Sequence, residues 1–128
     1  MKVLLDTHAL LWAYWGDPQL SAAAIRVIFD PANDVLVSPA SHWEIAIKMR
    51  TGKLTLRETF AEFVRHAVFD NGFAILNIEP RHTALVSQMP FHHKDPFDRL
   101  LIAQALVEGV PLVSADAVAD AYGISRLW

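Results

Sequence analysis

The sequence predicts an α/β fold, a three-layer α/β/α sandwich with a short, mostly parallel sheet, and three observations predict it. The chain has 128 residues, which suits one domain spanning 1–128, and 53% of them are hydrophobic, enough for a sizeable core. Its strand-like segments are short, continuous apolar runs, as expected of strands that are buried on both faces. These runs alternate with segments of helical spacing, which predicts a parallel sheet covered by helices on both sides.

The first half of the chain predicts two strands and four helices. The expected elements are a strand at 2–5, a helix at 9–14, a helix at 22–29, a strand at 35–37, a helix from 41 to 51 and an amphipathic helix at 56–69. Gly16-Asp17-Pro18 breaks the first helix, and Ser21 is the N-cap of the second. Ser41 and Glu44 have the spacing of a capping box, which opens the third helix, and Gly52 ends it.

The second half predicts three further strands and three further helices. The expected elements are a strand at 73–78, a helix at 80–89, a helix at 97–107, a strand at 111–114, a short helix at 116–122 and a last strand at 124–128. The long helix at 97–107 has Asp95 as its N-cap and Pro96 in its first turn, and Gly109 ends it. Crossovers between parallel strands are right-handed, so the carboxyl ends of all strands meet at one edge, where ligands bind in such folds.

Composition excludes several classes of protein. The chain has no cysteine, so a disulfide scaffold and a thiolate metal site are both excluded. No apolar run approaches the ~20 residues that a membrane-spanning helix needs, and Asp6 interrupts the N-terminal run too early for a signal peptide. We therefore expect a cytoplasmic protein. The net charge of −3 argues mildly against a nucleic-acid binder, although a carboxylate cluster within a balanced surface would give the same total.

Four carboxylates fall where this fold brings distant segments together. Asp6 follows the first strand, Glu44 begins the helix after the second, and Asp116 follows the strand at 111–114. Asp98 lies in the first turn of a helix that runs antiparallel to the strands, so it begins at the same edge. We therefore expect Asp6, Glu44, Asp98 and Asp116 to form one cluster.

Each acid also has a purely structural interpretation. Glu44 fits a capping box, Asp95 fits an N-cap, and Asp6 and Asp116 fit a turn and a helix cap. As a group, however, two carboxylates ~4 Å apart repel by about 4 kcal/mol at an effective dielectric near 20. A helix N-terminus offsets only ~0.3–1 kcal/mol of that. The cluster therefore predicts a bound divalent cation, and ligands that are all oxygen favour Mg²⁺ or Mn²⁺ over zinc.

Carboxylate-held Mg²⁺ in an open cleft is typical of enzymes that cleave phosphodiesters. No G-x-S-x-G elbow, P-loop or G-x-G-x-x-G motif occurs in the chain. Two alternatives remain. A phosphatase with Asp6 as nucleophile would want a second carboxylate two residues on, where His8 stands. A module without activity that binds metal or protein would not need all four acids.

The motifs around these acids resemble those of a known family. Four segments carry the resemblance: Lys2-Val3-Leu4-Leu5-Asp6-Thr7-His8-Ala9, Ser41-His42-Trp43-Glu44-Ile45-Ala46, Asp95-Pro96-Phe97-Asp98-Arg99-Leu100-Leu101-Ile102-Ala103-Gln104-Ala105 and Leu112-Val113-Ser114-Ala115-Asp116. In this order they are similar to the PIN-domain ribonucleases of the VapC toxin family, from toxin–antitoxin pairs. The resemblance covers the chain from end to end.

The resemblance implies a PIN-like fold and an endoribonuclease that uses Mg²⁺ or Mn²⁺. It implies that Asp6, Glu44, Asp98 and Asp116 bind the metal, with Asp95 mainly an N-cap that also approaches the cleft. It implies a hydroxyl role for Thr7 and for Ser114, which stands where the family often has Thr. Ala117 departs from the family, which often has a polar or basic residue there. It further implies an RNA substrate, a cognate antitoxin protein whose basic side chain enters the acidic groove, and a homodimer or higher oligomer.

Other residues are candidates for contact with RNA. Lys48, Arg50, Lys53 and Arg57 fall within ten residues that contain no acid, and form either a track for phosphates or an ordinary solvated helix end. Arg99 is expected to contact phosphate or brace an acid. The loop residues His92, His93 and Lys94 are interpreted as polar surface more readily than as substrate contacts. The concentration of Trp12, Tyr14, Trp15 and Trp43 favours core packing or a subunit interface over base stacking.

Overall fold

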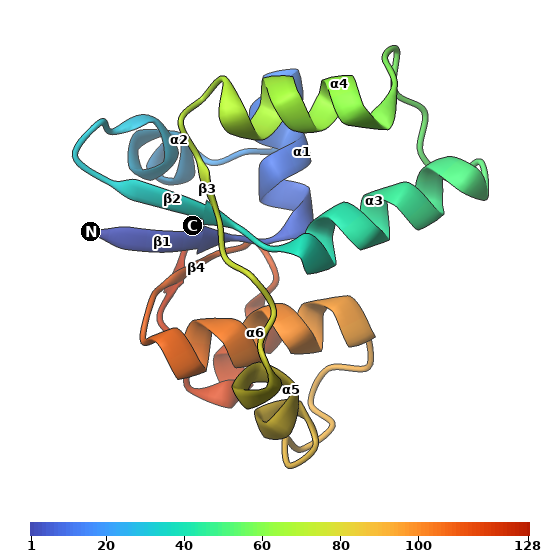
Figure 1. The fold of residues 1–128 in the computed structure, drawn as a ribbon. Coiled ribbons are helices and arrows are strands. Elements are labelled where there is room, and N and C mark those ends of the chain that lie inside the picture. Colours follow the sequence, from blue (N-terminus) through green and yellow to red (C-terminus); the bar gives the residue numbers. More distant parts are fainter.

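Five short parallel strands form the centre of the computed structural model, which describes residues 1–128, and helices cover both faces of their sheet (Figure 1). The strands are β1 (Lys2–Leu5), β2 (Asp34–Val37), β3 (Ala74–Ile75), β4 (Leu112–Val113) and β5 (Arg126–Leu127). Their order across the sheet is β3-β2-β1-β4-β5. The predicted α/β/α architecture with a short parallel sheet is confirmed.

Strand β1 lies at the middle of the sheet and is buried on both faces. Val3 pairs with Val35 of β2, and Leu5 pairs with Val113 of β4. Successive side chains of a strand point to opposite faces. Val3 and Leu5 accordingly join one hydrophobic cluster, while Leu4 joins the other. This explains why the run is apolar throughout and does not alternate.

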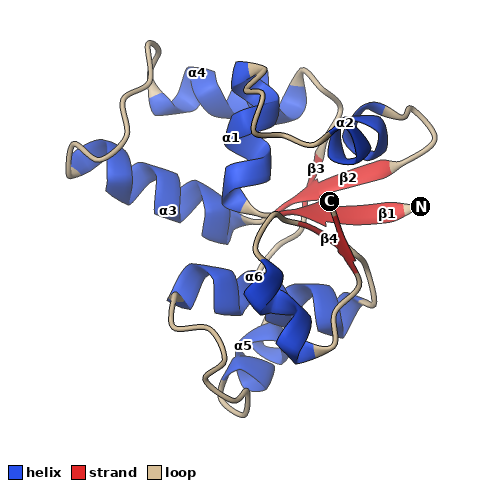
Figure 2. Cartoon of the chain, turned by 180° about the vertical axis from the view of Figure 1, so that it is seen from behind, coloured by secondary structure: helices blue, strands red, loops and turns tan.

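The helices form two layers of unequal size (Figures 1 and 2). One face of the sheet carries α1 (Thr7–Trp15), α2 (Ala22–Phe29), α3 (Pro39–Arg50), α4 (Phe60–Val64) and the π-helical turn η1 (Arg65–Phe69). The other carries α5 (Pro80–Val86), α6 (Pro96–Glu108) and the 3-10 helix η2 (Ala117–Tyr122). No helix has the length and hydropathy to cross a membrane.

Capping side chains set most helix boundaries. The hydroxyl of Ser21 accepts a hydrogen bond from the amide of Ala24 at the start of α2. The carboxylate of Asp95 accepts from the amides of Phe97 and Asp98 at the start of α6, with Pro96 in the first turn. Both caps are as predicted. In each, the side chain of the capping residue accepts hydrogen bonds from amides that have no partner within the helix.

Helix α3 begins earlier than predicted. Its N-cap is Ser38, whose hydroxyl accepts from the amide of Ala40 at 3.1 Å, and Pro39 occupies the first turn. Ser41 and Glu44 therefore do not form a capping box, and that prediction is wrong. Glu44 lies in the second turn of the helix, where its side chain is buried.

Two further elements are shorter than predicted. The helix expected at 56–69 begins only at Phe60, because Thr59 and Glu62 form a capping box there. The strand expected at 73–78 is restricted to Ala74–Ile75, at the edge of the sheet beside β2. In both places apolar spacing continues beyond the hydrogen-bonded element, so spacing alone overestimates its length.

Candidate metal centre

The carboxyl ends of β1 and β4 lie side by side at the middle of the sheet, and the candidate site is built there. The chain leaves β1 toward β2 on one side, while β4 flanks it on the other, which makes this the switch point of the topology. Asp6 follows β1, and Ser114 and Asp116 follow β4. Helix α6 starts at the same edge and runs back along the sheet, which brings Asp98 to it (Figure 1).

These segments enclose a small cavity. Asp6, His93, Asp98, Ser114 and Asp116 provide its polar lining, and the apolar part of the lining comes from Ile102, Leu112 and Ala119. Its volume of about 10 Å³ is close to the room that one water molecule needs. A space of this size suits a single small ion.

Asp6 is buried at the end of β1 and has several partners. Its carboxylate caps α1 by accepting from the amide of Ala9 at 2.7 Å, and it also accepts from the hydroxyl of Ser114. Burial raises the pKa of Asp6, and the Asp116 carboxylate adds to the rise, while the two hydrogen bonds oppose it. The group is thus held in a position where its negative charge is costly without a cation.

Asp98 is a second acid of the site whose pKa is raised. Burial raises the pKa of Asp98 to about 7, and nearby carboxylates add to the rise. The carboxylates that act on it are those of Asp95, Asp6 and Glu44. Because the Asp116 carboxylate acts in turn on Asp6, acids from four separate parts of the chain are linked electrostatically, as the sequence predicts.

Glu44 reaches this edge from helix α3, which packs against α6. Its Oε2 accepts a hydrogen bond from the ammonium of Lys48, one turn along, at 2.6 Å. Its Oε1 is buried and has no hydrogen-bond partner. An unpaired buried carboxylate oxygen costs free energy, so the side chain is arranged for a partner outside the chain.

His93 belongs to the site, which the interpretation of its loop as polar surface does not predict. Its Nε2 lies 2.6 Å from Oδ2 of Asp116 and 3.3 Å from Oδ2 of Asp98. The three side chains offer ligand atoms within 4.8 Å of one another. The available signal was a histidine two residues before the Asp95 N-cap, but nothing in the sequence showed which way that loop folds.

The donor set fits a small, hard divalent cation. Asp6, Asp98 and Asp116 line the cavity with carboxylate oxygens, and Glu44 has a free oxygen within electrostatic range of Asp98. Oxygen ligands of this kind are those that Mg²⁺ and Mn²⁺ take in proteins. A cation would also relieve the repulsion that raises the pKa of Asp98.

Several expected substrate contacts have structural roles instead. Arg99 is only 5% exposed, and its guanidinium donates to main-chain carbonyls of the 86–93 segment and to the hydroxyl of Tyr122. The expected contact of Arg99 with phosphate or an acid is therefore wrong. The buried Thr7 hydroxyl donates to that of Ser41, and the Ser114 hydroxyl accepts from the amide of Asp116.

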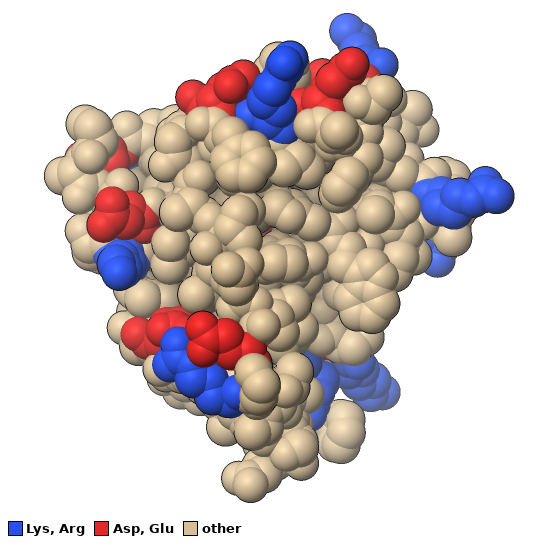
Figure 3. Space-filling model, viewed as in Figure 1, with Lys and Arg blue, Asp and Glu red and all other residues tan.

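The basic residues of α3 and of the loop after it differ in whether they form an ion pair. Lys48 is paired with Glu44, while Arg50 and Lys53 are exposed and form no ion pair within the chain. On the face seen in Figure 3, charged side chains lie around the periphery and no continuous basic stripe crosses the middle. The unpaired cations Arg50 and Lys53 lie at and just after the C-terminal end of α3.

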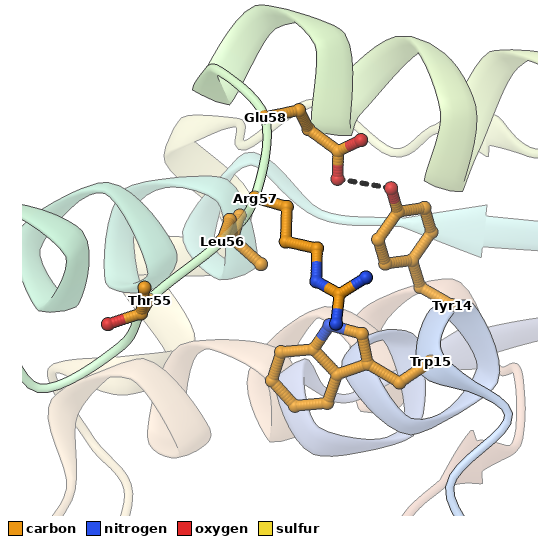
Figure 4. Close-up of a pocket in the computed structure, with 6 residues that line it drawn as sticks. All are labelled: Tyr14, Trp15, Thr55, Leu56, Arg57 and Glu58. Atoms are coloured by element: carbon orange, nitrogen blue, oxygen red, sulfur yellow. Dashed lines mark hydrogen bonds between the residues drawn. The ribbon is translucent and has the colours of Figure 1, made fainter.

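The largest hollow of the surface lies away from the acids. It has a volume of about 580 Å³ and is lined by Tyr14, Trp15 and the segment from Thr55 to Glu58. Figure 4 shows the Tyr14 hydroxyl directed to Glu58 and Arg57 extended over Trp15. The hydrogen bond to Glu58 raises the pKa of Tyr14 to about 12. No acid of the cluster lines this hollow.

The aromatic residues that cluster in the sequence differ in their burial. Trp12 packs against the core beside Trp128, but Trp43 is 62% exposed and touches Phe97 edge-on. Core packing is therefore correct for Trp12, while for the exposed Trp43 the other expected role, a subunit interface, stays a prediction.

Comparison with known proteins identifies the family. The family model described as PIN domain matches residues 3–124. The chain belongs to the PIN domain family. Ribonuclease VapC16 of Mycobacterium tuberculosis is 38% identical over 71 residues, which are 52% of this chain and 50% of VapC16. The match thus spans about half the length of that curated relative.

Solved PIN structures share the fold. VapBC2 from Rickettsia felis, bound to a DNA fragment from its promoter, superposes with a TM-score of 0.71 at 13% identity, covering 98% of this chain and 97% of that one. FitAcB from Neisseria gonorrhoeae superposes with a TM-score of 0.65 at 17% identity, covering 97% and 95%. The family model confirms the resemblance to PIN domains, the solved structures share the fold, and half of the chain is similar to a VapC ribonuclease.

Proposed function

We propose that this protein is a Mg²⁺- or Mn²⁺-dependent endoribonuclease that acts as the toxin of a toxin–antitoxin pair. One observation carries the proposal: carboxylates from four segments of a PIN domain meet at the carboxyl edge of the sheet, where Glu44 keeps a buried oxygen without a partner. This donor set suits a divalent cation and supplies no protein nucleophile, which is the requirement of metal-dependent phosphodiester hydrolysis.

The residues of the site have distinct tasks in this proposal. Asp6, Asp98 and Asp116 would hold the ion, and Glu44, whose Oε2 is bound to Lys48, would have its unpartnered Oε1 available to it. When bound, the metal lowers the pKa of a water and neutralises charge on the phosphate. Ser114 orients both neighbouring acids, because its hydroxyl bonds to the Asp6 carboxylate and to the Asp116 amide.

The proposed substrate is single-stranded or structured RNA. Arg50 and Lys53 are exposed without ion pairs on and just after α3, the helix that carries Glu44, so they are available to phosphates beside the site. Thr7, Arg99 and Ser114 are not substrate contacts in this proposal, because their polar groups are engaged within the chain.

The proposed protein partner is a cognate antitoxin in the cytoplasm, where the RNA is also found. Solved neighbours of this chain are toxin–antitoxin complexes by name, VapBC2 and VapBC-1. A basic side chain of the antitoxin would pair with the unneutralised carboxylates of the site. Self-association into a dimer or higher oligomer stays a prediction, to be measured by sedimentation.

The test is cleavage of single-stranded RNA by the purified chain with Mg²⁺ or Mn²⁺, with and without a chelator. Asp6→Asn should lower the rate by at least about a hundredfold, because a ligand matters more than the residues that orient ligands. Asp34→Asn is the matched control, since Asp34 is exposed at the opposite end of the sheet. Equal cleavage by both variants would show that the acidic cluster is not the active site.

Two outcomes separate this proposal from its alternatives. A chain that binds Mn²⁺ tightly but cleaves no RNA would be a metal-binding or protein-binding module without activity. A chain that cleaves RNA but does not arrest growth on expression would be a PIN nuclease outside toxin–antitoxin systems. Growth arrest relieved by co-expression of the neighbouring small gene supports the toxin.

A further inference from the structure

The ring of His93 contacts the site through one nitrogen and the main chain through the other. Nε2 faces the carboxylates of Asp116 and Asp98, at 2.6 and 3.3 Å. Nδ1 lies 3.1 Å from the main-chain nitrogen of Asp95 and accepts its N–H. The two ring nitrogens therefore have opposite environments, an acceptor on one side and a donor on the other.

This arrangement determines the tautomer of the ring. Neutral imidazole has one N–H and one lone pair, and the partner of each nitrogen decides which is which. The Asp95 amide can only donate, so the lone pair lies on Nδ1 and the proton on Nε2. The Nε2–H then points to Asp116, with Asp98 just beyond.

The same geometry opposes direct binding of the metal by His93. A histidine that ligates through Nε2 carries its proton on Nδ1 and donates it to a carboxylate or carbonyl. Here Nδ1 would direct that proton at the Asp95 N–H, so two donors would face each other. The proximity of His93 to Asp98 and Asp116 therefore does not make it a ligand.

The loop that carries His93 is held in place on both sides of its backbone. The His93 amide donates to the hydroxyl of Tyr122 at 2.8 Å, and the guanidinium of Arg99 donates to the His93 carbonyl at 3.4 Å. Arg99 also donates to the Tyr122 hydroxyl, which in turn donates to the carbonyl of Pro90. The side chain of His93 is 15% exposed, so its ring has little freedom to leave the site.

We propose that His93 is a positioning residue of the metal centre: its Nε2–H holds the Asp116 carboxylate, and the ion is held by oxygen atoms alone. The inference rests on the proposed metal-dependent function, but it concerns the arrangement of the ligands. The Asp95 main chain fixes the tautomer of the ring, and Arg99 and Tyr122 fix the loop that carries it. His93 is thereby held with its Nε2–H directed at the Asp116 carboxylate.

The first test needs neither metal nor RNA. In ¹⁵N-labelled protein without metal, long-range ¹H–¹⁵N correlation spectra report which ring nitrogen of each histidine carries the proton. We expect the pattern of the Nε2–H tautomer for His93, assigned by its absence in His93→Gln. The Nδ1–H tautomer would overturn the proposal.

The second test measures Mn²⁺ binding by calorimetry in variants. His93→Ala should weaken binding by about 10–100-fold, the usual effect of losing a group that orients a ligand. His93→Gln places an N–H donor at the position of Nε2 and should recover most of the affinity. His66→Ala is the control, because the His66 side chain is 42% exposed and its ring pairs only with Arg65 and Asp70. Unchanged or tighter binding by His93→Ala would overturn the proposal.

The third test asks whether the ion touches the ring. Pulsed electron paramagnetic resonance of the Mn²⁺-loaded protein detects coupling to a ligating imidazole nitrogen. We expect no such coupling, and its presence, lost in His93→Gln, would make His93 a ligand and the proposal wrong. If the tautomer and the Mn²⁺ affinities are as expected but RNA is not cleaved, the nuclease proposal fails and the role of His93 stands.

Discussion

The carboxyl group of Asp98 links protonation to stability. Its pKa is raised from 3.8 to about 7, first by burial and then by the Asp95 carboxylate. The folded chain therefore keeps a proton on Asp98 up to about pH 7, while the unfolded chain releases it near pH 3.8. Between these values the unfolded state binds fewer protons, so the free energy of unfolding falls as the pH rises, and it levels off above pH 7.

Asp98→Asn should remove that dependence and abolish RNA cleavage. Asparagine is close in shape to the protonated acid, so at pH 8 the metal-free variant should melt roughly 3–8 °C above the wild type. At pH 4 the two should melt together. Thermal unfolding across this range, with a chelator present, is the measurement. A variant that melts lower at pH 8 would mean that the interaction of Asp98 with the N-terminus of α6 outweighs the repulsion.

Arg99 is the residue whose place the sequence least predicts. Adjacent positions on a helix do not face the same way, so the side chain after Asp98 turns from the cleft into the protein. Because it satisfies several buried carbonyls, Arg99→Met should lower the free energy of unfolding by about 3 kcal/mol. Urea denaturation measures this, and faster proteolysis between 86 and 94 should accompany it. A neutral effect on stability would show that these hydrogen bonds do not stabilise the fold.

Helix α6 depends on Asp95 at its start. Asp95→Ala leaves the amides of Phe97 and Asp98 without their acceptor and should cost about 1 kcal/mol of stability. Asp95→Asn keeps the cap and removes a charge that raises the pKa of Asp98, so its stability should match or exceed that of the wild type. Denaturation curves of both variants at pH 7.5 test this. Equal loss in both would mean that the charge of Asp95, not the cap, stabilises the helix.

Helix starts show what the sequence predicts and where it misleads. Asp95-Pro96 and Ser38-Pro39 are the same signal, a capping side chain followed by proline, and each begins a helix. The Ser38-Pro39 signal places Glu44 in the second turn of α3. Spacing-based prediction chose Ser41 because a glutamate follows it three residues later, a pattern that also occurs inside helices.

The sequence likewise predicts some positions in the site and not others. The positions of Asp6, Asp98 and Asp116 at one edge follow from the order of strands and helices, which apolar runs and caps predict. The position of His93 does not, because hydrogen bonds to Tyr122 and Arg99 decide how its loop folds. These are contacts between side chains and a loop backbone, and the spacing of apolar residues in the sequence does not predict them.

At the scale of the molecule, charge is the main constraint on the proposed RNA binding. The chain carries a net charge of −3, and Lys48 is already paired with Glu44. Arg50 and Lys53 are exposed without an ion pair on and just after α3. In the proposed function a bound metal would therefore supply much of the attraction for the substrate, and broad electrostatic steering should be weak.

This predicts a shallow dependence of RNA affinity on salt. Each phosphate neutralised on single-stranded RNA contributes a slope of about −0.7 in log K against log salt, so two or three contacts give roughly −1.5 to −2. The wild type with Ca²⁺ in place of Mg²⁺, under conditions where the RNA stays intact, permits the measurement by fluorescence anisotropy. A slope steeper than about −4 would require at least five or six contacts, more than the exposed cations around α3 supply, and would place the RNA across a second surface of the protein.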